Sequence, residues 1–300
     1  MPVAAAVLLV CCASLLQAHD GFSSSSKARF QREIARDAAR LAALTAAASG
    51  FPIPSIAAAS IGSEQFLLSR LQSFDATAYR PGLTISDIFY PALFVGKWKA
   101  ASRLVGFDMP LGEGPFGGKR AVAKAEEEKS TPLSLVYETV FKGAGDTVVA
   151  DRLINVENIA RASMGPNSIL DDRQSAGGGS GINRLKLTVS PSAAQGLLFD
   201  IILQVSDREQ FVGPRSQLCA LERTIQTIRS NRDNGTSSKA VETITSYSLE
   251  SNSVIYARQR TATFWDSADS RYNDILREEP RLGKMAYDVR QYEVTYTRLA

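Results

Sequence analysis

Only four residues of this chain are histidine or cysteine, and three of them lie near its beginning. His19 is the single histidine, and Cys11 and Cys12 are two of the three cysteines. If this N-terminal stretch is removed, the remaining chain contains Cys219 and no histidine. That composition excludes a histidine general base, a histidine-ligated haem or zinc, and an intramolecular disulfide. We therefore predict no catalytic residue, no metal site and no cofactor.

Carboxylates are the groups that could still carry out acid–base chemistry without histidine. Their neighbours in the sequence alternate between apolar and polar residues, so we expect most of these carboxylates to face solvent. A register slip of one residue would reverse the direction in which each of them points. Six lie in segments that we interpret as strands: Glu138, Asp200, Glu222, Glu242, Glu250 and Glu293.

The segment Gly112–Lys119 formally matches the G-x-G-x-x-G pattern of dinucleotide-binding loops. That fingerprint needs a strand before the loop and a helix after it. Here we expect a second strand after the loop, and Pro115 lies within the pattern. A P-loop would need Ser or Thr after Lys119, and Arg120 stands there instead. We interpret the segment as a wide β-turn whose glycines permit positive φ.

The overall charge gives no indication of a nucleic-acid partner. The first sixty residues contain five basic and three acidic residues, which leaves 29 basic and 28 acidic residues in the rest of the chain. A nearly neutral body lacks the electrostatic attraction that nucleic acids and anionic membranes require. The hydrophobic fraction of 44% and the charged fraction of 22% are those of an ordinary globular protein.

We interpret residues 1–59 as a leader with three consecutive targeting signals. Val3–Leu16 has the length of a signal-peptide core and is too short to span a membrane. A stretch with Ser23–Ser26 and basic residues through Arg40 follows, which is typical of a plastid transit peptide. A second apolar segment, Leu41–Ala59, ends in an A-x-A cleavage motif. This order predicts delivery to the thylakoid lumen of a plastid. The alternative is that the alanine-rich part of the second apolar segment is a helix of the folded protein.

For the rest of the chain, the sequence predicts a helix and a linker followed by one all-β domain. Residues 60–90 hold an amphipathic helix, Glu64–Phe74, which we expect to end by Pro81-Gly82. Residues 91–300 predict an antiparallel barrel of about 8–10 strands with one or two short helices, and no later segment could span a bilayer. The expected strands are Trp98–Phe107, Lys119–Lys124, Leu133–Lys142, Thr147–Ala150, Arg184–Val189, Gly196–Val205, Cys219–Arg229, Ala240–Glu250, Ser253–Trp265 and Met285–Arg298, with a helix at Asn155–Met164 and a loop at Asp171–Gly181.

The start of the first expected strand resembles a lipocalin-type signature. Gly96-x-Trp98 follows Tyr90-Pro91. In lipocalins the tryptophan of this signature closes one end of the barrel and packs under an arginine near the end of the barrel sequence. The resemblance makes Arg290 and Arg298 the candidates for that arginine. A cation–π contact of this kind contributes about 0.5–2 kcal/mol, so the implied role is structural.

A wider resemblance covers about residues 62–300. The chain is similar to a family of cyanobacterial and plastid proteins that share a domain of unknown function. The resemblance implies an export signal and a calycin-like barrel, and it carries over no catalytic residue. The segments on which it rests are Tyr90–Gly112, Gly114–Val122, Val149–Gly165, Asn183–Val189, Tyr256–Trp265 and Tyr287–Arg298.

A Gly-x-Trp start together with a barrel favours the binding of a small apolar ligand, such as a lipid or a pigment. Phe199–Leu203 is apolar on both faces, so it is either buried on both sides or lines an apolar cavity. Two other functions remain open: an assembly or interaction factor for thylakoid complexes, and an enzyme that modifies lipids or carotenoids. The candidate residues for ligand binding or barrel closure are Trp98, Phe199, Ile201, Trp265 and Arg298.

Overall fold

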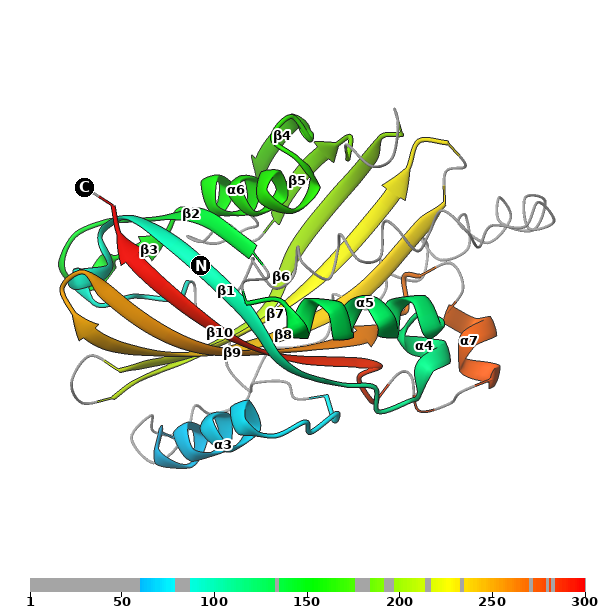
Figure 1. Ribbon diagram of the computed structural model, residues 1–300, viewed down its shortest axis with the longest axis horizontal. Coiled ribbons are helices and arrows are strands. Elements are labelled where there is room, and N and C mark those ends of the chain that lie inside the picture. The colour runs from blue at the N-terminus through cyan, green and yellow to red at the C-terminus, as the bar shows by residue number, and fades with distance from the viewer. Residues whose placement is uncertain are drawn as a thin grey trace, which may run out of the picture.

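A single antiparallel sheet dominates the computed structural model, which describes residues 60–78, 87–132, 135–175, 184–191, 197–213, 217–232, 235–269, 272–278, 281 and 284–299 (Figure 1). The proposed leader lies outside these ranges. The strands follow the order β3-β2-β1-β10-β9-β8-β7-β6-β5-β4. Their bounds are Gly96–Asp108 (β1), Leu135–Lys142 (β2), Val149–Ala150 (β3), Ile169–Ser175 (β4), Arg184–Val189 (β5), Phe199–Val212 (β6), Leu218–Ser230 (β7), Thr236–Ser251 (β8), Val254–Trp265 (β9) and Asp288–Arg298 (β10).

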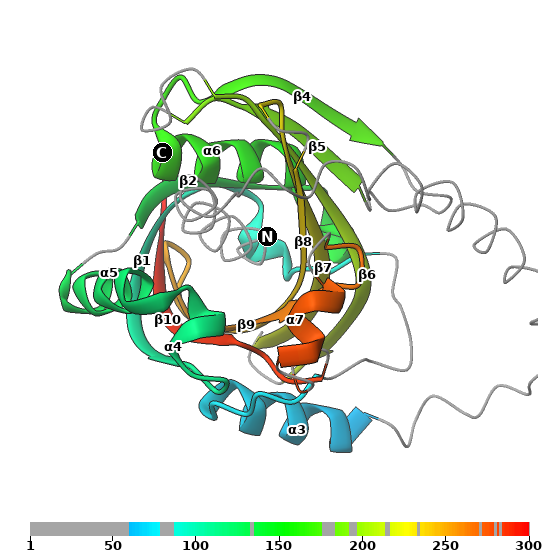
Figure 2. The same cartoon turned by 90° about the vertical axis from the view of Figure 1, so that its right-hand side faces the viewer.

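The prediction of a mainly β, antiparallel fold is confirmed, and the sheet curls without closing. Figure 2 looks along the curl, with β1, β10, β9, β8, β7 and β6 arranged around it. The two end strands, β3 and β4, do not pair with each other in the described sheet. The helices and short 3₁₀ turns are α3 (Ser60–Gln72), η1 (Ala92–Phe94), α4 (Glu113–Phe116), α5 (Gly118–Ser130), η2 (Gly145–Thr147), α6 (Arg152–Met164) and α7 (Tyr272–Glu278). Within the described ranges, no helix combines the length and the apolar character that a membrane crossing needs.

Two predictions about the strands are wrong. The expected strand Lys119–Lys124 is part of helix α5, where Ala121 and Ala125 lie four residues apart and pack with Phe116. A short alanine-rich segment can form a strand or a helix. Here Ala121 and Ala125 have the four-residue spacing of one helix face. The second error concerns the expected loop at Asp171–Gly181, because its residues 171–175 continue strand β4.

Strand β6 buries one face rather than two. Phe199, Ile201 and Leu203 belong to the main hydrophobic core. Asp200 and Ile202, which point the other way, are half-buried. Sheet alternation therefore holds along this strand even though its sequence is apolar at successive positions.

Helix α6 fills the space between β2 and the β4–β5 end of the sheet (Figure 2). Its buried Asn155 acts as a substitute for a neighbouring strand: Oδ1 accepts a hydrogen bond from the Val140 N–H at 2.6 Å, and Nδ2 donates to the Val140 carbonyl at 3.0 Å. Asn158 Nδ2 donates to the Glu138 carbonyl at 3.0 Å. Two asparagines of one helix thus satisfy backbone groups of β2 beyond the short strand β3.

Replacing Asn155 by alanine is expected to lower the free energy of unfolding by about 1–2 kcal/mol. The Val140 N–H would lose its acceptor, whereas its carbonyl would keep the hydrogen bond from the Asp151 N–H at 2.9 Å. Urea denaturation of the variant and of wild-type protein measures the difference. A stability equal to that of wild type would show that α6 does not hold this edge.

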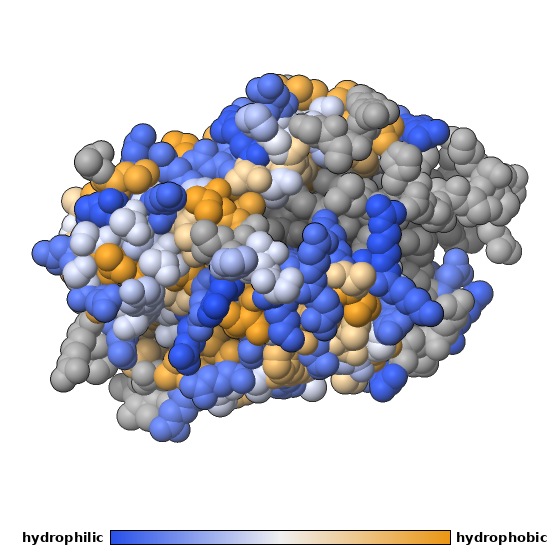
Figure 3. Space-filling model, viewed as in Figure 1, coloured by the Kyte–Doolittle hydropathy of each residue, from blue (hydrophilic) through white to orange (hydrophobic). Residues whose placement is uncertain are grey.

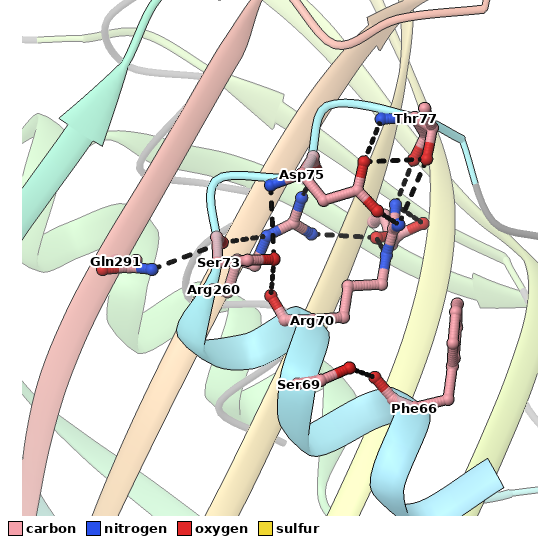
Figure 4. A network of polar contacts seen from close by, with 9 residues as sticks. Phe66, Ser69, Arg70, Ser73, Asp75, Thr77, Arg260 and Gln291 are labelled. Carbon is pink, nitrogen blue, oxygen red and sulfur yellow. Dashed lines mark hydrogen bonds and ion pairs between the residues drawn. The ribbon is translucent and has the colours of Figure 1, made fainter. Parts of the chain in front are cut away.

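Helix α3 covers the outer face of β7, β8 and β9. Leu67 and Leu71 pack there against Leu221 and other apolar residues. Beside them, Arg70 Nε lies 3.0 Å from Glu242 Oε1, and both side chains are buried. Figure 4 shows the surrounding contacts, in which Asp75 and Thr77 also contact Arg70 while Arg260 approaches from the sheet. The outer face of the sheet is therefore covered, and a carboxylate is buried beneath α3.

Candidate functional site

The main hydrophobic core shows which face of the curled sheet is the interior. Ala220 on β7, Val241 on β8 and Ala257 on β9 belong to that core. Because side chains alternate along a strand, every second residue from these points to the same interior. This interior includes a set of buried polar side chains that we call the polar belt: Glu222, Thr224, Gln226, Thr243, Thr245, Gln259, Thr261 and Thr263.

Strand register brings the members of the polar belt side by side. Thr243 pairs with Glu222 on one side and with Thr261 on the other. Thr245 pairs with Gln259. The belt is thus one continuous polar surface across three strands.

Most belt side chains lack hydrogen-bond partners in the described part of the protein. Buried polar groups in native proteins are nearly always hydrogen-bonded, so each exception requires an explanation. Eight such atoms lie in the belt: Glu222 Oε1, both amide atoms of Gln226, Gln259 Oε1, and the hydroxyls of Thr224, Thr243, Thr245 and Thr263.

Glu222 is held by two buried guanidinium groups. Its Oε2 lies 2.8 Å from Arg152 Nη1 and 3.0 Å from Arg208 Nε. Arg152 Nη2 also lies 2.6 Å from Asp87 Oδ1. Burial lowers the pKa of Arg152, but the carboxylates of Glu222 and Asp87 outweigh it and raise that pKa above its usual value. One oxygen of Glu222 is therefore fixed by this ion-pair cluster, and Oε1 is left without a hydrogen-bond partner among the described residues.

The prediction that strand carboxylates mostly face solvent is wrong for Glu222 and Glu242. Both are fully buried, on opposite faces of the sheet. Glu138 and Asp200 are half-buried, and Glu293 is exposed. The two exceptions are buried because β7 and β8 are covered on both faces, by α3 outside and by the core inside.

A second ion-pair cluster lies at the α4–α5 end of the curled sheet. Arg290 Nε lies 3.0 Å from Asp288 Oδ1, and its Nη1 lies 3.1 Å from Glu128 Oε2 on α5. The guanidinium carbon is 5.6 Å from the centre of the Phe116 ring. Arg290 therefore joins β10 to the helices at that end.

The opposite end is filled by aromatic side chains. The Arg298 guanidinium carbon lies 4.3 Å from the centre of the Trp98 ring, and Trp98 Nε1 donates to the Phe94 carbonyl at 2.7 Å. The Phe94 ring lies 5.2 Å from that of Phe141 and 5.5 Å from that of Tyr247. Of the two candidate arginines, Arg298 is the one that stacks on Trp98.

The five residues proposed for ligand binding do not form one site. Trp98 and Arg298 lie together at the aromatic end, while Phe199 and Ile201 lie on the apolar wall of β6. Trp265 ends β9, with its ring 5.4 Å from that of Tyr287. Their role in ligand binding stays a prediction. The belt was missed, although its threonines and glutamines recur at every second position in three successive expected strands.

The tyrosines of the main hydrophobic core give an independent test of how tightly the interior of the curled sheet is packed. Burial is the largest cause that raises the pKa of each: Tyr90, Tyr137, Tyr247, Tyr292 and Tyr296. A raised phenol pKa stabilises the fold below the unfolded value of about 10, and that stability is lost as pH rises through the folded value. Titration of the folded protein at 295 nm should therefore show only a minority of the nine tyrosines ionising near pH 10. The urea-unfolded chain, in which all nine should ionise there, is the control, and equal absorbance changes would contradict the packing.

Other chemical groups in the described residues do not form a site. Cys219 is buried on the outer face under α3. No cluster of His, Cys, Asp and Glu in the described ranges could hold a metal ion. The wide turn expected at Gly112–Lys119 is wrong, because α4 and α5 occupy most of it. A strand does precede these helices, but β1 pairs antiparallel with both neighbours, unlike the strand of a dinucleotide-binding βαβ unit.

The comparison with known families covers the same region as the curled sheet. The sequence model of a family described as a domain of unknown function (DUF6816) matches residues 82–292. The chain belongs to this family. The DUF6816 match includes the whole polar belt and Trp98, whereas α3 and Arg298 lie outside it. No curated protein and no solved structure matches the chain significantly.

Proposed function

We propose that this DUF6816 protein is a non-enzymatic carrier that binds a small molecule against its polar belt. One buried polar atom without a partner costs about 1–3 kcal/mol. If none of the eight belt atoms met water or a bound molecule, the cost would be comparable with the stability of a whole domain, about 5–15 kcal/mol. The belt therefore needs hydrogen-bonding partners, which ordered water or a bound molecule with polar groups can supply.

The interior surroundings of the belt favour a molecule that also has an apolar part. Leu203 on β6 pairs directly with Gln226 of the belt. Leu187, Ile201 and other core residues continue this apolar wall along β5 and β6. The ligand we propose is thus a lipid- or pigment-like molecule with hydrogen-bonding groups, rather than a purely apolar one. A lipocalin-like or calycin-like relationship remains part of this proposal.

Organic extraction of the protein purified from its own source tests the proposal. Mass spectrometry should find one small molecule in near-stoichiometric amount. The double variant Thr243→Val/Thr245→Val, which keeps side-chain shape but removes two hydroxyls, should lose that molecule. Thr297→Val is the matched control, because Thr297 is exposed on β10. Extracts without any reproducible small molecule, or equal retention by both variants, would overturn the carrier function.

The surface gives no specific support for the assembly-factor alternative. On the face in Figure 3, hydrophobic residues lie interspersed among hydrophilic ones. Among the described residues, the large hydrophobic side chains that are exposed are spread over several elements. Examples are Leu93 on η1, Val136 on β2, Ile154 on α6, Leu170 on β4 and Tyr256 on β9.

We further propose that the protein works in the thylakoid lumen of a plastid. The support is the leader sequence, which lies outside the described residues. N-terminal sequencing of the native protein should begin close to Ser60, after the A-x-A motif. A mature chain that still contains Arg36 would contradict the lumenal location.

A further inference from the structure

We propose that the ligand of the polar belt is uncharged and carries hydroxyl groups. This inference rests on the proposed carrier function and specifies the chemical class of its ligand. The hydrogen-bonding capacity of the belt and the charges around it lead to this class independently.

The belt requires a partner that donates hydrogen bonds. Glu222 Oε1 is a carboxylate oxygen and can only accept. Gln259 Oε1 is likewise an acceptor without a partner in the described chain. A ketone, an ether or an ester offers no donor to these atoms, whereas a hydroxyl group does.

The belt also requires a partner that accepts hydrogen bonds. The amide nitrogen of Gln226 can only donate, and it is buried without an acceptor among the described residues. The hydroxyls of Thr243 and Thr245 can take either role. An ammonium group, which only donates, would leave Gln226 unsatisfied. A hydroxyl group both donates and accepts, so it matches every position.

The charges inside the curled sheet favour an uncharged molecule. In the Glu222 cluster, Arg152 and Arg208 offset Glu222 and Asp87, and the four formal charges cancel. An anion would also meet the free oxygen of Glu222. On β10, next to the belt, Arg290 pairs with Thr261 across the strands and is already ion-paired with Asp288 and Glu128. These ion-paired groups would offer a charged ligand no free counter-charge, and burying it would be costly.

A series of probes that share a linear eight-carbon chain tests this class. The probes are octane-1,2-diol, 1-octanol, methyl octyl ether, octanoate and octylammonium. Binding to the full chain is followed by Trp265 fluorescence and by the side-chain amide NMR signals of glutamine. We expect the diol to bind most tightly, and the ether and both ions at least about 10-fold more weakly, which corresponds to one lost hydrogen bond at a charged or buried partner.

Gln259→Met gives a variant of similar volume in which the whole side-chain amide, including the acceptor Oε1, is removed. The preference for the diol over the ether should fall at least about 3-fold, while the affinity for the ether changes little. Gln291→Met, on the outer side of β10, is the control. Equal affinities for diol and ether, tightest binding of an ion, or no binding by any probe would overturn the hydroxyl assignment. The carrier function is judged separately by the extract from native protein, so a charged native ligand would refute this inference and leave that function standing.

Discussion

Replacing Glu222 by glutamine is expected to lower the free energy of unfolding by about 3–5 kcal/mol. The new side chain has nearly the same shape but no charge. Arg152 would lose the carboxylate of Glu222 and keep its ion pair with Asp87, and Arg208 would lose the carboxylate that it contacts at 3.0 Å. Buried guanidinium groups cannot recover their lost hydration, so the penalty remains in the folded state. Denaturation with urea, followed by circular dichroism, measures the change.

Glu138→Gln is the matched control for this variant. Glu138 lies on β2, and its Oε1 lies 3.4 Å from Lys97 Nζ, with 40% and 64% of the two side chains exposed. A surface ion pair contributes at most about 1 kcal/mol, so its loss should hardly change stability. If Glu222→Gln and Glu138→Gln had equal effects, the ion-pair cluster would not stabilise the fold as described.

Trp98→Ala should destabilise the protein by a similar amount, about 3–5 kcal/mol. The indole is completely buried, so its removal leaves a cavity next to Phe94. The Arg298 guanidinium would also lose the ring on which it stacks. The midpoint of chemical unfolding should shift without a change in the slope of the transition.

Trp98→Phe separates the packing of the ring from its hydrogen bond. Phenylalanine keeps an aromatic face under Arg298 but cannot donate to the Phe94 carbonyl. Its cost should stay below that of the alanine variant, at about 1–2 kcal/mol. Stability of Trp98→Ala within about 1 kcal/mol of wild type would contradict the tight aromatic packing of this end.

Most of the strands could be predicted because their sequences alternate. Arg184–Val189 has the same bounds in the prediction and in the structure, and the helix expected at Asn155–Met164 begins only three residues earlier. Lys119–Lys124 failed because alternation in a short, alanine-rich segment does not distinguish a strand from a helix. The role of α6 beside β2 also escaped prediction, since the hydrogen bonds of Asn155 depend on where a distant strand lies.

The candidate site was harder to predict than the fold. Glu222 was identified as lying in a strand, but its direction depends on register and its burial depends on Arg152, seventy residues away. A carboxylate in an alternating segment is usually solvated, and only the tertiary structure shows the two guanidinium groups that stabilise it here. The expectation of an apolar interior came from Phe199–Leu203, which does line the core. The neighbouring strands β7, β8 and β9 bring the polar residues to the same interior.

The pairing of β1 with β10 has a consequence for how the chain folds. Trp98 pairs with Arg298, so these two strands join segments that are two hundred residues apart. In the sheet, β10 lies between β1 and β9, and β1 carries β2 and β3. The first three strands therefore have no place in the main sheet until β10 has been synthesised. Contacts across such long separations slow folding, because closing the loop costs entropy before the strands can pair. During synthesis, the early strands should stay accessible to proteases and chaperones until the residues of β10 become available.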